Sequence, residues 1–275
     1  MRREITGFIA LILFLVCVLW SYGIWLAVVV ASAAFFFAHE EIYNLFSIPR
    51  SLPLIFWQNI LAVLFLVCAV LHMIPSLLII TFLFFWGSCL ISMSKAVKGS
   101  RYEIAIHGLL FIYLLLPIAC FVYLRSLEHG PALLFFTLSV ACLTDTGAYY
   151  GGRLLGKHKL APILSPNKTW EGAIAGAALT TAIILITAYG YSIFNENTLW
   201  LSGPHQYGHI IIITILLSAV GQVGDLCESA MKRDAGIKDS GTMDTGHGGF
   251  LDMMDSMLWI GPAMFVYSIL FCYSG

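Results

Sequence analysis

Hydrophobic residues occur in this chain as long blocks that are separated by short polar segments. A helix needs about 20 apolar residues to cross a hydrocarbon core of about 30 Å, and most of the blocks approach that length. The pattern predicts nine membrane-spanning helices, around residues 6–21, 23–38, 55–72, 75–94, 104–123, 131–150, 172–191, 207–224 and 250–272. We therefore expect an all-α fold, that of a polytopic integral membrane protein.

The composition supports this class and excludes a soluble globular protein. Of the 275 residues, 60% are hydrophobic and 11% are charged, whereas a soluble domain has about 25% charged residues. The net charge of −1 gives no sign of a nucleic-acid partner. The 7 cysteines lie mostly inside apolar blocks and form no CxxC pair, which favours buried thiols over disulfides or a zinc site.

The first apolar block has a second interpretation. Its basic start, MRRE, followed by an apolar run, is typical of a signal peptide as well as of a first helix. Because many further spans follow, we favour an uncleaved helix. We expect a single membrane domain over 1–275, with N-terminal helices in about 1–124 and a catalytic part in about 131–275.

The basic residues predict the orientation, since cytoplasmic loops of membrane proteins carry an excess of Lys and Arg. If the N-terminus is cytoplasmic, 13 of the 14 basic residues are cytoplasmic and only Arg125 is outside. The 13 are Arg2, Arg3, Arg50, Lys95, Lys98, Arg101, Arg153, Lys157, Lys159, Lys168, Lys232, Arg233 and Lys238. The polar loops 151–171 and 225–249 then share the cytoplasmic side, and the C-terminus is outside; in a bacterium the membrane would be the inner one.

Acidic residues gather in a short part of the C-terminal region. Seven of the 15 lie between 225 and 255: Asp225, Glu228, Asp234, Asp239, Asp244, Asp252 and Asp255. Asp225, Glu228 and Lys232 share one helical face, and Asp252 and Asp255 have i, i+3 spacing. Ionisable groups inside a membrane usually mark a functional site, and carboxylates with phosphate oxygens suit Mg²⁺. A structural ion-pair network with Lys232, Arg233 and Lys238 is the alternative.

The segment GHGG, residues 246–249, favours function over a purely structural role. Three glycines flank His247 directly before an apolar helix. Backbone N–H groups at a helix N-terminus bind anions, and glycine allows a ligand to approach closely, so Gly248 and Gly249 are candidates for phosphate binding. His247 alone is weak support, because a single histidine is as often a structural hydrogen-bond partner.

A second polar cluster covers Thr144 to Gly176. Asp145 ends an apolar span, and Arg153, Lys157, Lys159 and Lys168 follow within a short loop. Ser165 or Thr169 is expected to cap the next helix, and both, with Glu171, are candidate substrate-binding residues. An ordinary positive-inside loop would explain the cations alone.

Two further features of the sequence allow simpler interpretations. Small-residue pairs at Gly147/Gly151, Gly152/Gly156 and Gly172/Gly176 predict close helix packing rather than chemistry. His39, Glu40 and Glu41 end the second span, where they either line the same cavity or cap that span.

Two stretches resemble the phosphatidate cytidylyltransferase, or CDP-diacylglycerol synthase, family. SAMKRDAGIKDSG with GHGGFLDMMD resembles the family signature, and TDTGAYYGGRLLGKHKLAP with SPNKTWEG resembles a second family block. The resemblance is strong over about 144–176 and 224–256. It implies a multi-helix membrane architecture with a polar cavity facing the cytoplasm, in which CTP and phosphatidic acid give CDP-diacylglycerol and pyrophosphate. A homodimer is a candidate assembly.

The resemblance also implies site residues. It assigns a Mg²⁺ site, with K⁺ as a candidate second ion, to Asp225 and Asp252. Its other motif positions are Ser229, Lys232, Arg233, Lys238, Asp239, His247, Asp255, Asp145, Lys168 and Glu171. The chain departs from the family pattern at Asp244, Thr245 and Met253, where the family usually has an apolar residue, proline and arginine. A relative acting on another lipid phosphate and an impaired family member therefore stay open.

A transporter is the alternative from another functional class, since polar residues in a helical bundle also mark ion pathways. The acids, however, cluster at one membrane face rather than at the midplane, and the sequence shows no inverted repeat.

Overall fold

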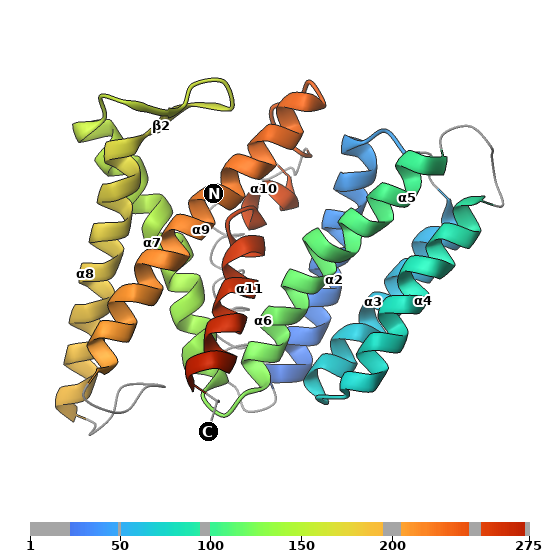
Figure 1. Ribbon diagram of the computed structural model, residues 1–275, viewed down its shortest axis with the longest axis horizontal. Coiled ribbons are helices and arrows are strands. Elements are labelled where there is room, and N and C mark those ends of the chain that lie inside the picture. Colours follow the sequence, from blue (N-terminus) through green and yellow to red (C-terminus); the bar gives the residue numbers. More distant parts are fainter. Residues whose placement is uncertain (1–22, 49–50, 94–99, 195–204, 242–248, 273–275) are drawn as a thin grey trace, which may run out of the picture. The chain divides into compact units, whose positions relative to one another are not determined.

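Long apolar helices make up almost all of the chain described by the computed structural model, which covers residues 23–48, 51–93, 100–194, 205–241 and 249–272 (Figure 1). Within these ranges, 8 helices are long and apolar enough to cross a membrane. They are Gly23–Leu45, Leu52–Val70, Ile74–Ser92, Ala105–Ser126, Gly130–Leu155, Trp170–Ile193, Gln206–Asp234 and Phe250–Cys272. Each coincides with a predicted span, which confirms a polytopic all-α membrane protein; the predicted span 6–21 lies outside the described residues.

The chain forms two compact units. Unit 1 contains Met1–Ser126 and Asp239–Met253, and unit 2 contains Leu127–Lys238 and Met254–Gly275. The short segment Asp239–Met253 thus packs with the N-terminal helices although it follows most of unit 2 in sequence. The predicted convergence of Asp225 in unit 2 and Asp252 in unit 1 on one cation stays a prediction.

Unit 1 is a bundle of consecutive spans, in which α3 and α4 lie side by side (Figure 1). Its elements are α2 (Gly23–Leu45), α3 (Leu52–Val70), α4 (Ile74–Met93), α5 (Ser100–Leu109), the π-helical turn η1 (Leu110–Leu115) and α6 (Leu116–Ser126). Pro117 follows η1 and has no N–H group to continue an α-helical ladder, which gives the wider turn a local cause. The short helix α10 (Phe250–Met254) begins in this unit.

A buried hydrogen-bonded layer connects four of these helices. The Gln58 Oε1 atom accepts hydrogen bonds from Tyr43 (3.1 Å) and His39 Nε2 (2.8 Å). The Gln58 Nε2 atom donates to Ser88 (3.1 Å) and to His107 Nδ1 (3.1 Å). Polar side chains inside an apolar bundle are stabilising only when they are paired, so Gln58 fixes the register of the helices around it.

Unit 2 contains α7 (Gly130–Leu155), α8 (Trp170–Phe194), α9 (Gln206–Asp234), α11 (Met257–Tyr267) and the π-helical end η2 (Ser268–Cys272). The α7 and α8 helices approach closely, as the glycine spacing predicts. A Cβ atom on Gly172 would lie 2.7 Å from the carbonyl oxygen of Ala148, and one on Gly176 would lie 2.7 Å from that of Thr144. Thr144 also bonds Ser218 of α9 (2.8 Å), so α7 is held against both neighbouring helices.

A two-stranded antiparallel sheet joins α7 to α8, where the sequence predicts only a polar loop. Its strands are β1 (Lys159–Ala161) and β2 (Ser165–Thr169), with Lys159 paired to Thr169 and Ala161 to Ser165. The all-α prediction is correct for the spans, and this small hairpin is the exception. It carries the cluster of polar side chains that the sequence places between the two helices.

Candidate functional site

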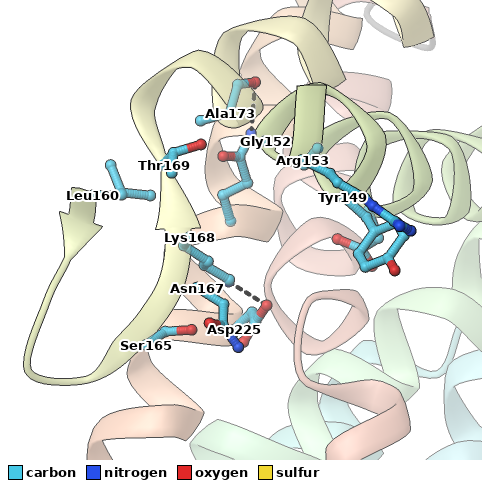
Figure 2. A pocket seen from close by; sticks show the side chains of 13 residues that line it. Tyr149, Gly152, Arg153, Leu160, Ser165, Asn167, Lys168, Thr169, Ala173 and Asp225 are labelled. Atoms are coloured by element: carbon cyan, nitrogen blue, oxygen red, sulfur yellow. Dashed lines mark hydrogen bonds and ion pairs between the residues drawn. The ribbon is translucent and has the colours of Figure 1, made fainter. Parts of the chain in front are cut away.

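A cavity of about 510 Å³ lies in unit 2 between α7, α9 and the β-hairpin. Volumes of about 300–1,000 Å³ are typical of small-molecule sites. Figure 2 shows Lys168 of β2 and Asp225 of α9 pointing toward one another, with Ser165 and Asn167 beside them. The lining residues are Asp145, Ala148, Tyr149, Gly152, Arg153, Leu160, Ser165, Asn167, Lys168, Thr169, Ala173, Gln222 and Asp225. Two predicted candidate sets, the 144–176 cluster and Asp225, therefore meet in one place.

An ion pair between Lys168 and Asp225 forms the centre of this cavity. Both side chains are about one-quarter exposed, at 25% for Lys168 and 26% for Asp225. The Ser229 hydroxyl lies one helical turn further along α9 and donates to Asp225 Oδ1 at 3.5 Å. A partly exposed ion pair can exchange partners with an incoming charged ligand, since both groups already reach solvent.

Two more carboxylates belong to the same electrostatic environment. Asp145 interacts with the charges of Asp225 and Lys168 and accepts a hydrogen bond from the Ser256 side chain. Asp255 interacts with Asp225, Asp145 and Lys168. Asp145, Asp225 and Asp255 thus bring carboxylate oxygens, and Lys168 brings a cation, to one electrostatic environment.

Close packing of α9 against the chain before α11 brings Asp255 to this place. A Cβ atom on Gly224 would lie 2.9 Å from the backbone oxygen of Asp255 and 2.6 Å from the Trp259 ring. Only a residue without a side chain fits there. Gly224 therefore allows the two acidic positions, Asp225 and Asp255, to share one site.

Arg153 and Tyr149 also line the cavity, although sequence reasoning does not select them as site residues. Both lie on α7, Tyr149 at i+4 and Arg153 at i+8 from Asp145. Residues with this spacing share a helical face, so the spacing from Asp145 is the signal that would have identified them. Arg153 adds a second cation to the cavity, and Asn167 adds an amide.

The two residues predicted as helix caps have different roles. The Thr169 hydroxyl accepts a hydrogen bond from the N–H of Gly172 (3.1 Å), which confirms Thr169 as the cap of α8. Ser165, the alternative cap, lies at the start of β2, where the chain is extended, so the structure selects Thr169 of the two. Both side chains line the cavity.

Glu171 binds the chain that enters the hairpin. Its carboxylate accepts hydrogen bonds from the N–H groups of Lys157 (3.0 Å) and His158 (3.1 Å) and lies 2.6 Å from His158 Nδ1. These bonds fix the connection between α7 and β1. They support a structural role for Glu171 in holding the hairpin over the cavity.

The basic end of α9 is largely engaged with the protein itself. Lys232 Nζ lies 2.6 Å from the fully buried Glu228 carboxylate. The Arg233 guanidinium donates to the carbonyl oxygens of Leu164 (3.4 Å) and Ile237 (3.1 Å), so it ties the hairpin turn to α9. Lys238, at the end of unit 2, is exposed. The alternative interpretation of the acidic cluster, a structural ion pair, therefore holds for Lys232 and Glu228.

A different arrangement surrounds Asp252 in unit 1, where the neighbouring candidate Asp239 is exposed. The Asp252 Oδ2 atom accepts hydrogen bonds from the N–H groups of Ser240 (2.9 Å) and Gly249 (2.6 Å). Both donors are backbone groups, so they hold the Asp252 carboxylate in place. The candidates His247 and Gly248, and the departures Asp244 and Thr245, lie outside the described residues.

The acidic residues fit a divalent cation in their chemistry. Within the ranges that the structure describes, no group of three or more His, Cys, Asp and Glu side chains forms a ready-made metal site. Mg²⁺, however, usually takes only one or two carboxylates and completes its shell with water and substrate phosphate. Asp225, with Asp145 and Asp255 in the same environment, offers oxygen donors of this kind.

The fold and the cavity define a polytopic integral membrane protein with a charged site of small-molecule size, built from residues of α7, α8, α9 and the β-hairpin that joins α7 to α8. The sequence profile of the Cytidylyltransferase family matches residues 1–271. The chain belongs to that family.

Several curated relatives have the printed name phosphatidate cytidylyltransferase. The Staphylococcus saprophyticus protein is 44% identical over 147 residues, which cover 52% of this chain and 52% of the relative. The Bacillus subtilis protein is 39% identical over 173 residues, covering 62% and 60%. The Haemophilus influenzae protein is 37% identical over 191 residues, covering 66% and 64%. The matched part of the chain thus spans between about half and just under two thirds of these relatives.

Proposed function

We propose that this protein transfers the cytidylyl group of CTP to phosphatidic acid and releases CDP-diacylglycerol and pyrophosphate. The observation that carries the proposal is the unit 2 cavity, in which Asp225 and Lys168 form an ion pair beside Asp145 and Arg153. This cavity has cationic side chains that can bind phosphate oxygens and carboxylates that can bind a metal ion. Both kinds of side chain lie near the ends of membrane spans. Family membership and the names of the relatives support CTP and phosphatidic acid as the substrates.

The proposed reaction is a single in-line displacement. An oxygen of the lipid phosphate attacks the α-phosphorus of CTP, a new P–O bond forms, and the bond to the β-phosphate oxygen breaks. Pyrophosphate leaves with the electron pair. The lipid phosphate is already an anionic nucleophile, so the protein has to position the reactants and stabilise charge rather than supply a covalent intermediate.

The side chains of the cavity have distinct tasks in this proposal. Lys168 and Arg153 bind phosphate oxygens, because charge-assisted hydrogen bonds to phosphate are among the stronger polar contacts. Ser229 orients the Asp225 carboxylate through the hydrogen bond along α9. Asn167 and Ser165 offer neutral hydrogen-bonding groups beside Lys168.

Asp225 and Asp252 are the proposed ligands of Mg²⁺, with Asp145 and Asp255 as further carboxylates near Asp225. When bound, Mg²⁺ neutralises the triphosphate and orients its α-phosphate. A neighbouring K⁺ belongs to the same proposal. The proposed orientation, with the N-terminus and this site on the cytoplasmic side where CTP is found, is supported by the distribution of basic residues.

The test is an assay on membranes that contain the expressed protein. Labelled CTP, phosphatidic acid and Mg²⁺ should give labelled CDP-diacylglycerol, and a chelator should abolish the product. A panel with other lipid phosphates identifies the acceptor: a product formed only with another lipid phosphate would replace phosphatidic acid in the proposal. No product with any acceptor would overturn it.

A further inference from the structure

Glu41, near the C-terminal end of α2, binds a segment of unit 1 that lies about 200 residues further along the chain. Its Oε1 atom accepts a hydrogen bond from the N–H of Phe250 at 2.6 Å. Its Oε2 atom accepts hydrogen bonds from the N–H of Leu251 and from the Ser240 hydroxyl, both at 2.8 Å. One carboxylate therefore holds the first residues of α10 and the chain that precedes residues 242–248.

Two glycines make room for this carboxylate. A Cβ atom on Gly241 would lie 2.8 Å from Glu41 Oε1, and a Cβ atom on Gly249 would lie 2.5 Å from Glu41 Oε2. A side chain at either position would push the carboxylate away from its donors. At these two positions, the absence of a side chain makes room for the carboxylate of Glu41, an anion that belongs to the protein itself.

Asp252 also binds the residues on both sides of 242–248. Its Oδ2 atom accepts the N–H groups of Ser240 and Gly249. Ser240 is therefore held twice, through its hydroxyl by Glu41 and through its backbone by Asp252. Any displacement of Glu41 also disturbs the bonds that set the position of the Asp252 carboxylate.

We propose that Glu41 is a positioning residue that fixes residues 240–241 and 249–252, and with them the Asp252 carboxylate, to the N-terminal helices. Both Glu41 oxygens accept hydrogen bonds from these residues, which is the arrangement expected of a side chain that holds them in place. The consequence for catalysis depends on the proposed function, because it assumes that Asp252 acts in cytidylyl transfer. The anchoring itself does not depend on it.

The test is hydrogen–deuterium exchange of the full-length protein in detergent, read on peptides that cover residues 240–252. Glu41→Gln keeps the size of the side chain but leaves one acceptor oxygen and turns an NH₂ group toward an N–H donor. Exchange in these peptides should become at least about tenfold faster, since hydrogen bonds to charged groups are the strongest of their kind. Glu41→Asp retains both oxygens on a shorter side chain. Its exchange rate should lie between those of the natural protein and of Glu41→Gln.

Glu128→Gln is the control, because Glu128 is an exposed carboxylate that belongs to unit 2. Its exchange over 240–252 should match that of the natural protein. If Glu41→Gln does not fold, Ser240→Ala removes a single donor from the same carboxylate and should still accelerate exchange in these peptides. Unchanged exchange in folded Glu41→Gln, or in Ser240→Ala when it carries the test, would overturn the anchoring.

Activity provides a separate measurement. The Glu41→Gln variant should lower kcat with little change in the KM for CTP, with partial rescue by Glu41→Asp. A lower kcat with unchanged exchange would refute positioning and indicate direct contact with the substrate. If the natural protein shows no transfer activity while Glu41→Gln still accelerates exchange, the proposed function fails and the anchoring stands.

Discussion

The carboxylates of unit 1 and unit 2 differ in their partners, which are mainly backbone N–H groups in unit 1 and a charged side chain in unit 2. In unit 1, Glu41 and Asp252 accept hydrogen bonds from backbone N–H groups and from a serine hydroxyl. In unit 2, Asp225 pairs with the side chain of Lys168, and Asp145 and Asp255 lie in the same field of charge. Backbone donors cannot move without unfolding the segment that carries them, whereas a lysine side chain can turn to a ligand. The unit 1 carboxylates therefore hold their segment in place, whereas the partly exposed Asp225–Lys168 pair of unit 2 is able to exchange partners.

The largest expected effect is that of Asp225→Asn, which removes the carboxylate at the centre of the unit 2 cavity. We expect CDP-diacylglycerol formation to fall by at least about 10²–10³-fold, since removing one group that stabilises transition-state charge has effects of that size. The assay with labelled CTP measures it. Asp234→Asn, at the exposed end of the same helix, is the control and should retain activity. Equal losses of product in both variants would contradict a specific role for Asp225.

Replacing Lys168 should have the next largest effect. Lys168→Met removes a proposed phosphate ligand and leaves Asp225 without the cation that faces it, so kcat/KM should fall by about 10²-fold, with partial recovery in Lys168→Arg. Steady-state kinetics with varied CTP measure the change. Lys159→Met, on the neighbouring strand, should remain close to the natural protein; activity retained in Lys168→Met would mean that the ion pair is only structural.

Arg153→Ala should have a smaller and more selective effect. The side chain lines the cavity but bonds no carboxylate at its centre, so its loss should raise the KM for CTP by about tenfold and change kcat little. The control is Lys157→Ala, an exposed cation a few residues further on. A loss confined to kcat would place Arg153 at the reacting phosphate instead of at the triphosphate tail.

Met253→Arg should change activity least. Met253 is 44% exposed, and an exposed charge contributes little, so the variant should stay within about fivefold of the natural protein. If activity appears only in the variant, the natural chain is an impaired family member, and the contrast between the two units no longer describes a working enzyme.

The spans are predictable from sequence because each depends on its own residues. Eight predicted spans coincide with helices, but α9 continues to Asp234 whereas its apolar block ends near residue 224. Hydropathy marks where the lipid-facing surface stops, and a helix can continue beyond it. The β-hairpin was not predicted because strands of three and five residues, one containing Pro166, have too little periodicity to be recognised.

The site is only partly predictable because its key contacts join distant residues. Asp225 and Lys168 are each identifiable as candidates, but their ion pair joins positions 57 residues apart. Glu41 contacts Leu251, 210 residues away, and no local pattern distinguishes it from Glu40. Arg153 differs, since its helical spacing from Asp145 would have placed it in the cavity.

The most direct test of the central claim is a hydrogen–deuterium exchange footprint of CTP with Mg²⁺ on the full-length protein. If the unit 2 cavity binds the triphosphate, saturating ligand should slow exchange in peptides covering β2 and the Asp225–Ser229 turn of α9, and Lys168→Met should weaken this protection. Protection confined to other parts of the chain, with β2 and α9 unchanged at saturation, would contradict the account.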